Sequence, residues 1–345
     1  MRIVLDAMGS DRAPAADVEG AVRAARRFGH EIVLVGRQAL IEAELAKHNA
    51  ADLPLSIVPA EQVIGMDEHP SQAVRRKPDS SMVVGMGLVR EGQADAFVSA
   101  GNSGGVLASA LAGAGRLGRI RGIRRPALST VLPTVSGSCL LLDIGANTDC
   151  RPEWLVQFAV MGSIYAQRVL GVPNPRVALL SNGEEETKGD ALVIEAHQAL
   201  KQIQGLNFIG NAEGKDLPMG AADVIVADGF AGNVAIKTAE GVASMMLQLL
   251  RTHIKASPIT AVGGLLAKPA FRQVARVLDY REYGGAPLLG VNGVVIIAHG
   301  RSDPLAIENA VRVAVDAVAG GVVERIREGV AALGAGDESA ENETE

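Results

Sequence analysis

The sequence predicts an α/β fold in which helices cover both faces of a mostly parallel sheet, giving a three-layer α/β/α domain. Short β-branched runs alternate with longer helical patterns along most of the 345 residues, and this alternation is typical of parallel sheets. Apolar residues make up 48% of the chain but aromatic residues only 3%, which favours a core of Ala, Val, Ile and Leu. No linker or internal repeat interrupts the pattern, so we expect a single domain over residues 1–333.

The strands are predicted from apolar runs that Gly, Pro, Asn or Asp residues bound. They are Arg2–Leu5, Glu31–Val35, Leu55–Val58, Ala94–Ser99, Cys139–Leu142, Val177–Leu180, Phe208–Gly210 and Val224–Ala227. The helical patterns between them are Asp17–Phe28, Arg37–His48, Ser80–Glu91, Gly104–Gly115, Glu153–Leu170, Asp190–Gln204 and Asn233–Thr252. Because a helix follows nearly every strand, right-handed crossovers between parallel strands are expected.

Two segments near the end of the chain break this rhythm. Residues 253–283 read as a protruding helical hairpin that turns at Gly263–Leu266 and carries an apolar tip with Leu265, Leu266 and Phe271. Such a tip with lysines nearby can rest on a membrane surface, and a helical dimer contact explains it equally well. A last helix over about Pro304–Ala332 precedes an acidic tail, residues 334–345, that we expect to be disordered.

The charge of the chain excludes some classes of function. The net charge is −6, and the tail beyond Gly336 holds five acids and no base, so the rest of the chain is nearly neutral. A neutral body argues against a general nucleic-acid binder. The early acid Asp6 argues against a signal peptide, no run of about 18 apolar residues suggests a membrane span, and two cysteines fit a reducing compartment. We therefore expect a cytoplasmic protein.

Polar and glycine-rich loops follow five of the predicted strands, each just before a helix. In a parallel sheet such loops gather beyond the carboxyl ends of the strands, where ligands bind. We expect all five to converge on one edge of the sheet and to form a site together. They are Asp6–Asp11, Ser99–Gly105, Asp143–Asn147, Ser181–Gly189 and Asp228–Asn233.

One of these loops has the form of a phosphate-binding turn. In Gly101-Asn102-Ser103-Gly104-Gly105, free N–H groups and the helix dipole can hold an anion, and Asn102 and Ser103 add side-chain donors. The loop lacks the Gly-Lys-Ser/Thr ending of a nucleotide-binding P-loop, and no G-x-G-x-x-G follows the first strand. Inorganic or small phosphate therefore fits better than a nucleotide, and an ordinary tight turn with a helix cap fits equally well.

Two further loops carry candidates for contacts with a reacting group. Lys188 follows three consecutive glutamates, Glu184–Glu186, and is a candidate anion clamp or oxyanion stabiliser. A salt bridge to those glutamates explains it without any function. Asn233 opens a long helix, so it is either an N-cap or a carboxamide directed at a carbonyl or phosphate oxygen.

The remaining polar residues at strand ends suggest support for the site. Asp6, Asn147 and Asp228 follow strands, but no histidine or cysteine stands at ligand spacing, so we expect no metal. His299, after the apolar run ending in Ile297, is a candidate general base or simply bonds a neighbouring carbonyl. No G-x-S-x-G sequence occurs and neither cysteine has an adjacent base, so no covalent acyl-enzyme is indicated.

Five arginines crowd one short glycine-rich stretch. Because aromatic residues are absent from it, this density favours docking of an acidic partner over stacking of bases. A solvated loop with scattered ion pairs is the alternative. The residues are Arg116, Arg119, Arg121, Arg124 and Arg125.

Taken in order, these motifs resemble the bacterial acyl-carrier-protein:phosphate acyltransferase family of phospholipid synthesis (PlsX). The match covers nearly the whole chain, and Ser10 and Ser103-Gly104-Gly105 are its small departures from the family pattern. The motifs are Asp6-Ala7-Met8-Gly9, Ala100-Gly101-Asn102, Leu142-Asp143-Ile144-Gly145-Ala146-Asn147, Lys188-Gly189, Asp228-Gly229-Phe230, Gly232-Asn233, Tyr283-Gly284-Gly285-Ala286 and Ala298-His299-Gly300.

The resemblance implies transfer of a long-chain acyl group from acyl-carrier-protein to inorganic phosphate, without a cofactor. It further implies a homodimer with a fold like isocitrate and isopropylmalate dehydrogenases. Peripheral contact with the inner face of the membrane would come through the hairpin, and a membrane glycerol-phosphate acyltransferase would consume the acyl-phosphate. The lysine and asparagine of the family's cleft match Lys188 and Asn233.

From the residues, we assign Lys188 to the phosphate and oxyanion and Asn233 to the carbonyl oxygen. Asn102 and Ser103 would hold phosphate, while Asp6 and Asn147 support the site. The competing interpretations are an acyl-CoA:phosphate exchange enzyme, a dehydrogenase on the same type of fold, and a membrane-surface scaffold for lipid synthesis. The dehydrogenase needs a nicotinamide site that the sequence does not show.

Overall fold

The computed structural model describes residues 1–342, and the side chains of these residues except Tyr280 and residues 334–342. One sheet of eleven strands runs through the described part, in the order β3-β2-β1-β4-β11-β10-β5-β6-β9-β7-β8. Its strands are β1 (Arg2–Asp6), β2 (Glu31–Gly36), β3 (Leu55–Pro59), β4 (Ala96–Ser99), β5 (Ala127–Thr134), β6 (Gly137–Leu142), β7 (Val177–Ser181), β8 (Phe208–Glu213), β9 (Val224–Val226), β10 (Ala286–Leu289) and β11 (Val294–Ile297).

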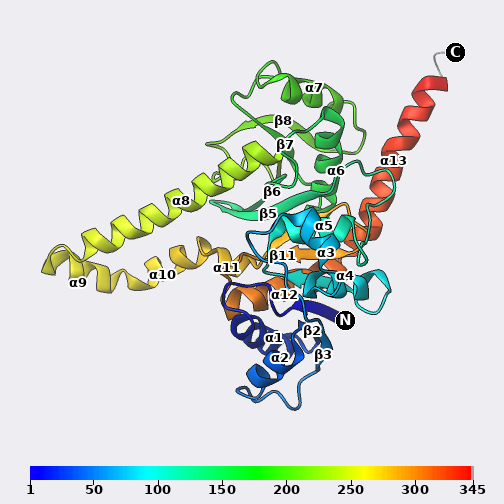
Figure 1. Cartoon of the computed structure of the whole chain (residues 1–345). Helices are drawn as coiled ribbons and strands as arrows, with labels where there is room; N and C mark the ends of the chain where they lie inside the picture. The colour runs from blue at the N-terminus through cyan, green and yellow to red at the C-terminus, as the bar shows by residue number, and fades with distance from the viewer. Residues whose placement is uncertain (343–345) are drawn as a thin grey trace.

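Helices pack on both faces of this sheet (Figure 1). Alternate residues of each strand face opposite sides, so Ile3 and Leu5 lie in the core with α1 and α12, whereas Val4 packs on the side of α4. The helices are α1 (Ala15–Phe28), α2 (Gln38–Leu45), α3 (Pro70–Arg76), α4 (Ser81–Arg90), α5 (Ser103–Leu111), α6 (Pro152–Arg168), α7 (Ala191–Leu200), α8 (Gly229–Ile254), α9 (Pro258–Leu266), α10 (Lys268–Val277), α11 (Tyr280–Tyr283), α12 (Pro304–Ala319) and α13 (Val322–Asn342). The predicted α/β class with a mostly parallel sheet is confirmed.

The sheet consists of two parallel halves that run in opposite directions. β3, β2, β1, β4 and β11 are parallel to one another, and so are β6, β9, β7 and β8. Between them the pairings β11–β10, β10–β5 and β5–β6 are all antiparallel, and three reversals leave the halves opposed. The prediction that all five loops converge on one edge of the sheet is therefore wrong.

The two sets of carboxyl ends nevertheless meet near the middle of the sheet. Ile297, the last residue of β11, pairs with Ala286. Leu142, the last residue of β6, pairs with Ser129, whose hydroxyl donates to the carbonyl of Pro287 at 3.0 Å. Because Ala286 and Pro287 are consecutive, β11 and β6 end at nearly the same level. The halves are offset, so that their carboxyl ends come together although their directions differ.

The strands that create this reversal are the ones that the sequence analysis missed. β5 carries Ser129, Thr130 and Pro133 and is only partly buried along most of its length, so it lacks an apolar run. β10 has four residues and includes Pro287. Polar residues and proline weaken the pattern by which strands are recognised.

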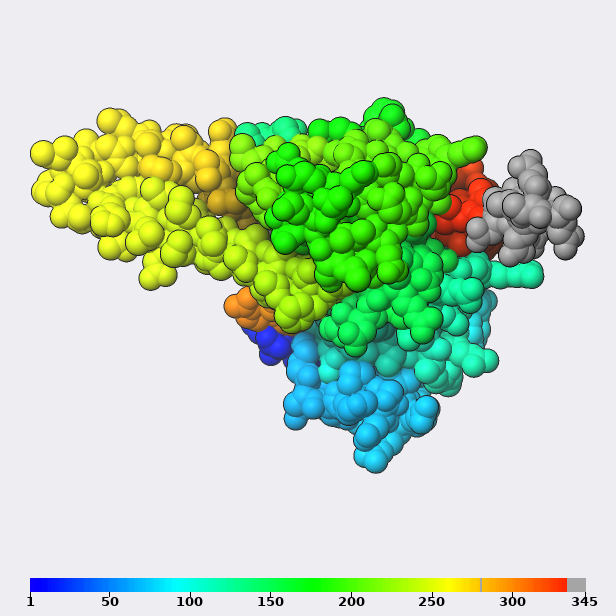
Figure 2. Space-filling view, turned by 90° about the horizontal axis from the view of Figure 1, so that it is seen from above, coloured from blue at the N-terminus to red at the C-terminus, as the bar shows by residue number. Residues whose placement is uncertain are grey.

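A pair of long arms projects from the sheet (Figures 1 and 2). α8 runs outward, α9 lies at the far end, and α10 and α11 return. The predicted turn at Gly263–Leu266 is wrong, because these residues lie inside α9. The chain instead bends before Ser257, whose hydroxyl accepts a hydrogen bond from the N–H of Thr260 in a capping box. Among the described helices, none has both the length and the apolar character needed to cross a bilayer.

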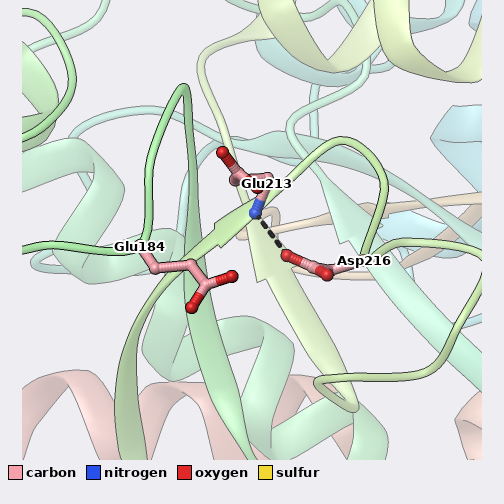
Figure 3. A group of neighbouring side chains, drawn as sticks. All are labelled: Glu184, Glu213 and Asp216. Carbon is pink, nitrogen blue, oxygen red and sulfur yellow. Dashed lines mark hydrogen bonds between the residues drawn. The ribbon is translucent and has the colours of Figure 1, made fainter.

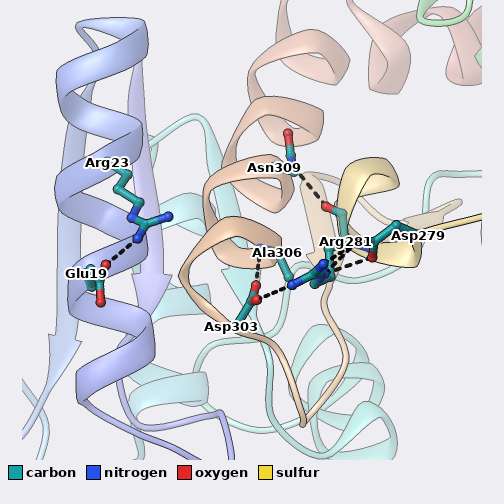
Figure 4. Close-up of polar contacts among 7 residues, drawn as sticks. All are labelled: Glu19, Arg23, Asp279, Arg281, Asp303, Ala306 and Asn309. Atoms are coloured by element: carbon teal, nitrogen blue, oxygen red, sulfur yellow. Dashed lines mark hydrogen bonds and ion pairs between the residues drawn. The ribbon is translucent and has the colours of Figure 1, made fainter. Parts of the chain in front are cut away.

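An ionic cluster fixes the returning arm to α12 (Figure 4). Arg281 Nη1 donates to Asp303 at 2.8 Å, and Arg281 Nε donates to Asp279 at 2.8 Å. Asn309 Nδ2 donates to the backbone carbonyl of Arg281 at 2.9 Å. Since Asp303 also caps α12 by accepting from the N–H of Ala306, the base of the arms is tied to the first turn of that helix.

The end of the chain differs from the prediction of one helix over Pro304–Ala332. α12 ends at Ala319 and α13 begins at Val322, and the break contains Gly321 with φ +60°. The predicted disordered tail is residues 334–345. The structure does not describe the side chains of residues 334–342 or any part of residues 343–345. That expectation stays a prediction, although α13 is assigned to Asn342.

Close packing of α8 on the loop after β6 requires glycine at position 232. A Cβ at Gly232 would lie 1.9 Å from the carbonyl oxygen of Asp143, whereas a Cβ at Gly241, farther along α8, would meet nothing within 4 Å. We expect Gly232→Ala to lower the free energy of unfolding by about 1–3 kcal/mol. The matched Gly241→Ala should raise it by up to about 1 kcal/mol through helix propensity. Urea denaturation measures both, and equal effects would contradict the packing argument.

Candidate functional site

A buried carboxylate organises the loops after β1 and β4. Asp6 Oδ1 accepts from the N–H of Met8 at 3.0 Å, and its Oδ2 accepts from the hydroxyl of Ser99 at 2.7 Å. Burial raises the pKa of Asp6, and the hydrogen bonds to it oppose that rise. A Cβ at Gly9 would lie 2.8 Å from the N of Gly101, so the two loops are in close contact. Asp6 thus supports this edge from inside the protein.

The glycine-rich loop after β4 uses most of its polar groups internally. Asn102 Nδ2 donates to the carbonyls of Gly65 and Met66, both at 3.1 Å, and Asn102 Oδ1 accepts from the N–H of Gly105 at 3.0 Å. Asn102 is therefore the N-cap of α5 and ties down the segment before α3. What this loop offers to a ligand is the exposed Ser103 together with the first N–H groups of α5.

His299 lies where the two halves of the sheet approach each other. It follows β11, and its Nδ1 accepts from the N–H of Arg301 at 3.1 Å. Burial lowers the pKa of His299, and the positive charges of Arg301 and Lys237 lower it further. Lys237 belongs to α8, which starts from the other half, so α8 passes beside this loop. The imidazole is consequently neutral at neutral pH and able to accept a proton.

A second buried carboxylate, Asp143, organises the loop after β6. Asp143 Oδ1 accepts from the N–H groups of Leu128, Gly145 and Ala146, and its Oδ2 accepts from the backbone and the amide of Asn147. Burial raises the pKa of Asp143 against these hydrogen bonds. The sequence analysis gave Asp143 no role, although an apolar run ending in Asp-Ile-Gly-Ala-Asn is the pattern of an Asx turn.

Asn147 also forms hydrogen bonds with the backbone around it. Its Nδ2 donates to the carbonyl of Pro126 at 2.8 Å, and its own carbonyl accepts from the N–H of Gly229 at 2.7 Å. Gly229 is the first residue of α8. Asn147 therefore fixes the start of α8 relative to β6.

The start of α8 leaves Asn233 available. Asp228 is the N-cap, because its Oδ1 accepts from the N–H groups of Phe230 and Ala231 at 2.9 and 3.0 Å. The interpretation of Asn233 as the N-cap is therefore wrong. Asn233 is exposed and its side-chain amide lies beside Gly145. Among the described residues, no hydrogen bond engages this side chain.

Lys188 is also left without an acidic partner. The glutamates that precede it pair elsewhere, Glu186 with Lys201 at 2.7 Å and Glu184 with Lys215 at 3.5 Å. Lys188 is exposed and its stem packs on Gly183, where a Cβ would lie 2.6 Å from the lysine Cγ. Within the described part of the chain its ammonium forms no ion pair, so the salt-bridge explanation fails.

The structure thus divides the predicted site residues between two edges. β6, β9 and β7 are neighbours in the sheet, so the loops that carry Asn147, Asp228 with Asn233, and Lys188 lie next to one another. β1, β4 and β11 are neighbours in the other half, and their loops carry Asp6, Gly101 to Ser103, and His299. α8 links the two groups through Lys237 near His299.

An acidic cluster of one exposed and two half-buried carboxylates includes Glu184 from the loop of Lys188 (Figure 3). The carboxylates of Glu184, Glu213 and Asp216 lie within 4.8 Å of one another, and Asp216 accepts from the N–H of Glu213 at 2.9 Å. Lys215 contacts both glutamates, and the contact raises its pKa. The cluster is therefore a partly neutralised surface network.

The predicted arginine cluster partly surrounds a hollow of about 870 Å³. Arg116, Arg119, Arg124 and Arg125 line it, and Arg121 does not. Arg151 and Trp154, which the sequence analysis did not single out, complete its wall. They come from the start of α6, far from the cluster in sequence, so no local pattern could have connected them.

The chemistry of these loops suits group transfer without a covalent intermediate. Burial raises the pKa of both Cys139 and Cys150 to about 12, so neither thiol supplies a thiolate at neutral pH. A free ammonium, a free carboxamide and a helix N-terminus are instead groups that hold an anion and polarise a carbonyl. They make these loops the candidate site of an α/β enzyme that acts on an oxyanion.

Comparison with known proteins identifies the family. The family model described as "Fatty acid synthesis protein" matches residues 1–325, and the chain belongs to this family. The phosphate acyltransferase of Desulfitobacterium hafniense (strain DSM 10664 / DCB-2) is 52% identical over 328 residues, covering 95% of this chain and 97% of that protein. The family's enzymes transfer acyl groups to phosphate, and this chain is an acyltransferase of lipid biosynthesis.

Solved structures share the fold at low sequence identity. A phosphotransacetylase from Streptococcus pyogenes superposes with a TM-score of 0.62 at 18% identity, covering 94% of each chain. A 4-hydroxythreonine-4-phosphate dehydrogenase from Klebsiella pneumoniae gives 0.51 at 15% identity, covering 92% of this chain and 98% of that one. Both acyl-transfer and dehydrogenase chemistry thus occur on this architecture, so the fold alone does not select between them.

The first turn of α1 contains a carboxyl group whose pKa lies near neutrality. Asp17, in the first turn of α1, is fully buried and accepts from the hydroxyl of Ser10 at 2.7 Å. Burial raises the pKa of Asp17 to about 7, and the nearby Asp6 adds to the rise. Its second oxygen, Oδ1, has no hydrogen-bond partner in the structure. The folded protein therefore keeps a proton on Asp17 that the unfolded chain has lost above about pH 4.

We expect this proton to make stability fall as pH rises from about 4 to 7. In that window the folded state binds the extra proton, so Asp17 lowers the free energy of unfolding by up to about 1.4 kcal/mol per pH unit. Asp17→Asn keeps an acceptor for Ser10 and should flatten the slope. Urea denaturation of both proteins at several pH values tests this, and identical slopes would show that Asp17 is ionised in the folded state.

Proposed function

We propose that this chain transfers a long-chain acyl group from the thioester of acyl-carrier-protein to inorganic phosphate, giving acyl-phosphate. The observation that carries the proposal is the pair of polar side chains left unengaged on neighbouring loops, Lys188 and Asn233. Every other candidate at that edge is used to hold the backbone. An ammonium offsets the negative charge of phosphate, and a carboxamide donates a hydrogen bond to the oxygen of a thioester carbonyl.

The reaction requires positioning and charge stabilisation, because phosphate is itself the nucleophile. A phosphate oxygen attacks the thioester carbonyl carbon, the C–S bond breaks, and the proton of hydrogen phosphate ends on the leaving thiol. Lys188 offsets the charge of phosphate and of the developing oxyanion, and Asn233 Nδ2 donates to the carbonyl oxygen. Ser103 and the start of α5 hold the remaining phosphate oxygens. His299, whose pKa burial lowers, is the candidate proton carrier.

Removing the ammonium should abolish most of the turnover. We expect Lys188→Ala to lower the rate of acyl-phosphate formation by about a hundredfold or more, with an unchanged circular dichroism spectrum. The matched control is Lys201→Ala, which removes a nearby exposed lysine that pairs with Glu186 and should stay within about twofold of the wild type. The assay follows labelled phosphate into acyl-phosphate with acyl-carrier-protein thioester as donor.

The identity of the donor rests on the arginine cluster. Arg116, Arg119, Arg121, Arg124 and Arg125 are exposed and present positive charge to the acidic surface of a carrier protein. The alternative donor is the coenzyme A thioester. Rates that depend on the carrier, fall with salt and are lower with coenzyme A support the carrier, whereas equal rates with both donors would favour the exchange enzyme.

We further propose that the projecting arms contact the membrane and a second copy of the chain. Leu265 and Leu266 are 67% and 78% exposed, and the neighbouring Ile259 is 86% exposed. Phe271 is half-buried and contributes less. Large apolar side chains exposed in this density are typical of interaction surfaces. Delivery of acyl-phosphate to a membrane glycerol-phosphate acyltransferase would explain a position on the inner face of the membrane.

Charges at the far end of the arms should release the protein from vesicles. We expect Leu265→Asp with Leu266→Asp to reduce co-sedimentation with anionic phospholipid vesicles at least tenfold, because burying a carboxylate in lipid is unfavourable. Leu40→Asp is the control, since Leu40 is 45% exposed on α2, a helix of the body of the molecule. If the double variant still sediments like the wild type, another surface makes the contact.

A further inference from the structure

The arginine-lined hollow carries an excess of positive charge that the protein does not neutralise. Its wall contains Arg116, Arg119, Arg124, Arg125 and Arg151 but one carboxylate, Glu153. Within the described part of the chain, none of the five arginines forms an ion pair with a carboxylate. Like charges gathered in a concave site repel one another, so an anion that enters is bound favourably.

The backbone that carries these arginines is fixed, and the arginines line the hollow. Arg119 Nη1 donates to the backbone carbonyl of Arg124. Ile120 and Ile123 anchor the loop in the core. The Gln157 side chain accepts from the N–H of Arg124 at 2.8 Å and donates to the carbonyl of Gly122 at 2.8 Å. A site whose backbone is already ordered loses little entropy on binding, and guanidinium forks match phosphate oxygens.

The hollow is adjacent to the candidate site but separate from it. Pro126 lines the hollow, and its carbonyl accepts from Asn147 Nδ2 at 2.8 Å. Leu111 also lines it and ends α5, whose other end carries Ser103. The nine residues of that helix separate the two ends by about 13 Å at a rise of 1.5 Å per residue. A single phosphate ion cannot occupy both places, but a slender flexible arm can reach from one to the other.

We infer that the hollow binds a phosphate group of the acyl donor, namely the phosphate at the base of the flexible arm that carries the thioester. This phosphate is distinct from the one that is acylated. The inference rests on the proposed function for the identity of the donor. Phosphate held by arginines in the hollow would fix one end of the arm and leave the thioester end free to enter the site.

The chain contains a built-in reporter for this binding. Trp154 is the one tryptophan of the sequence and lines the hollow. The guanidinium of Arg125 lies 5.0 Å from its ring centroid, a cation–π contact. A bound phosphate that draws Arg125 away from the indole changes the tryptophan emission, so occupancy can be followed without a label.

The test titrates the full-length protein with 4′-phosphopantetheine, pantetheine and inorganic phosphate, following Trp154 emission and, in parallel, calorimetric heat. We expect saturable binding of phosphopantetheine at least tenfold tighter than that of pantetheine, which differs by the phosphate alone. Arg124→Gln with Arg151→Gln should weaken phosphopantetheine binding at least tenfold. Arg121→Gln removes a charge from the same loop without touching the hollow and should change this binding by less than twofold.

Three results would overturn the inference. Equal binding of phosphopantetheine and pantetheine would show that the phosphate is not recognised. Unchanged binding by the Arg124→Gln and Arg151→Gln double variant, with a native circular dichroism spectrum, would place the ligand elsewhere. Saturation by inorganic phosphate without binding of phosphopantetheine would make the hollow a site for free phosphate. Lys188→Ala should retain phosphopantetheine binding, so a failed transfer assay and a failed binding assay are distinguishable.

Discussion

The whole arrangement depends on the offset between the two opposed halves of the sheet. Strands that run in opposite directions have their carboxyl ends at opposite edges, and ligand-binding loops would then be far apart. Here β10 pairs with β11 through Ala286 and Pro287 and with β5 through Leu288 and Leu289. This short strand shifts one half along the other, so that both sets of carboxyl ends meet. Loops from both parallel halves of the sheet are therefore brought near one another.

Each half holds its loops with one buried carboxylate. Asp6 binds the loops after β1 and β4, and Asp143 binds the loop after β6 and, through Asn147, the start of α8. Burying a carboxylate is unfavourable unless hydrogen bonds compensate, and both residues accept several. Because these side chains satisfy the backbone, they leave few polar groups over for a substrate. The residues that remain available, Lys188, Asn233 and Ser103, stand out against this background.

The sequence was sufficient for most elements but not for their assembly. Runs such as Ile3–Leu5 and Ile32–Val35 are buried on both faces, so their strands could be recognised from composition alone. The direction of the second half depends on β5 and β10, whose polar residues and prolines hide them. In the same way, the freedom of Lys188 follows from Glu184 and Glu186 pairing with Lys215 and Lys201, partners that only the fold brings near. Arg151 and Trp154 also line the arginine hollow, and only the fold brings them near residues 116–125.

Some exposed cations of the chain are paired with acids, as in Arg176 with Asp223 and Arg281 with Asp279 and Asp303. Within the described part of the chain, Lys188 and the arginines of the hollow are not. An exposed pair contributes little to stability, so leaving Lys188 and the arginines of the hollow unpaired has little effect on folding. When a substrate displaces water from them, the same charges act in a medium of lower dielectric constant and interact more strongly. Cations left unpaired at two separate places therefore suit the proposed reaction, in which one phosphate is acylated and a second belongs to the donor.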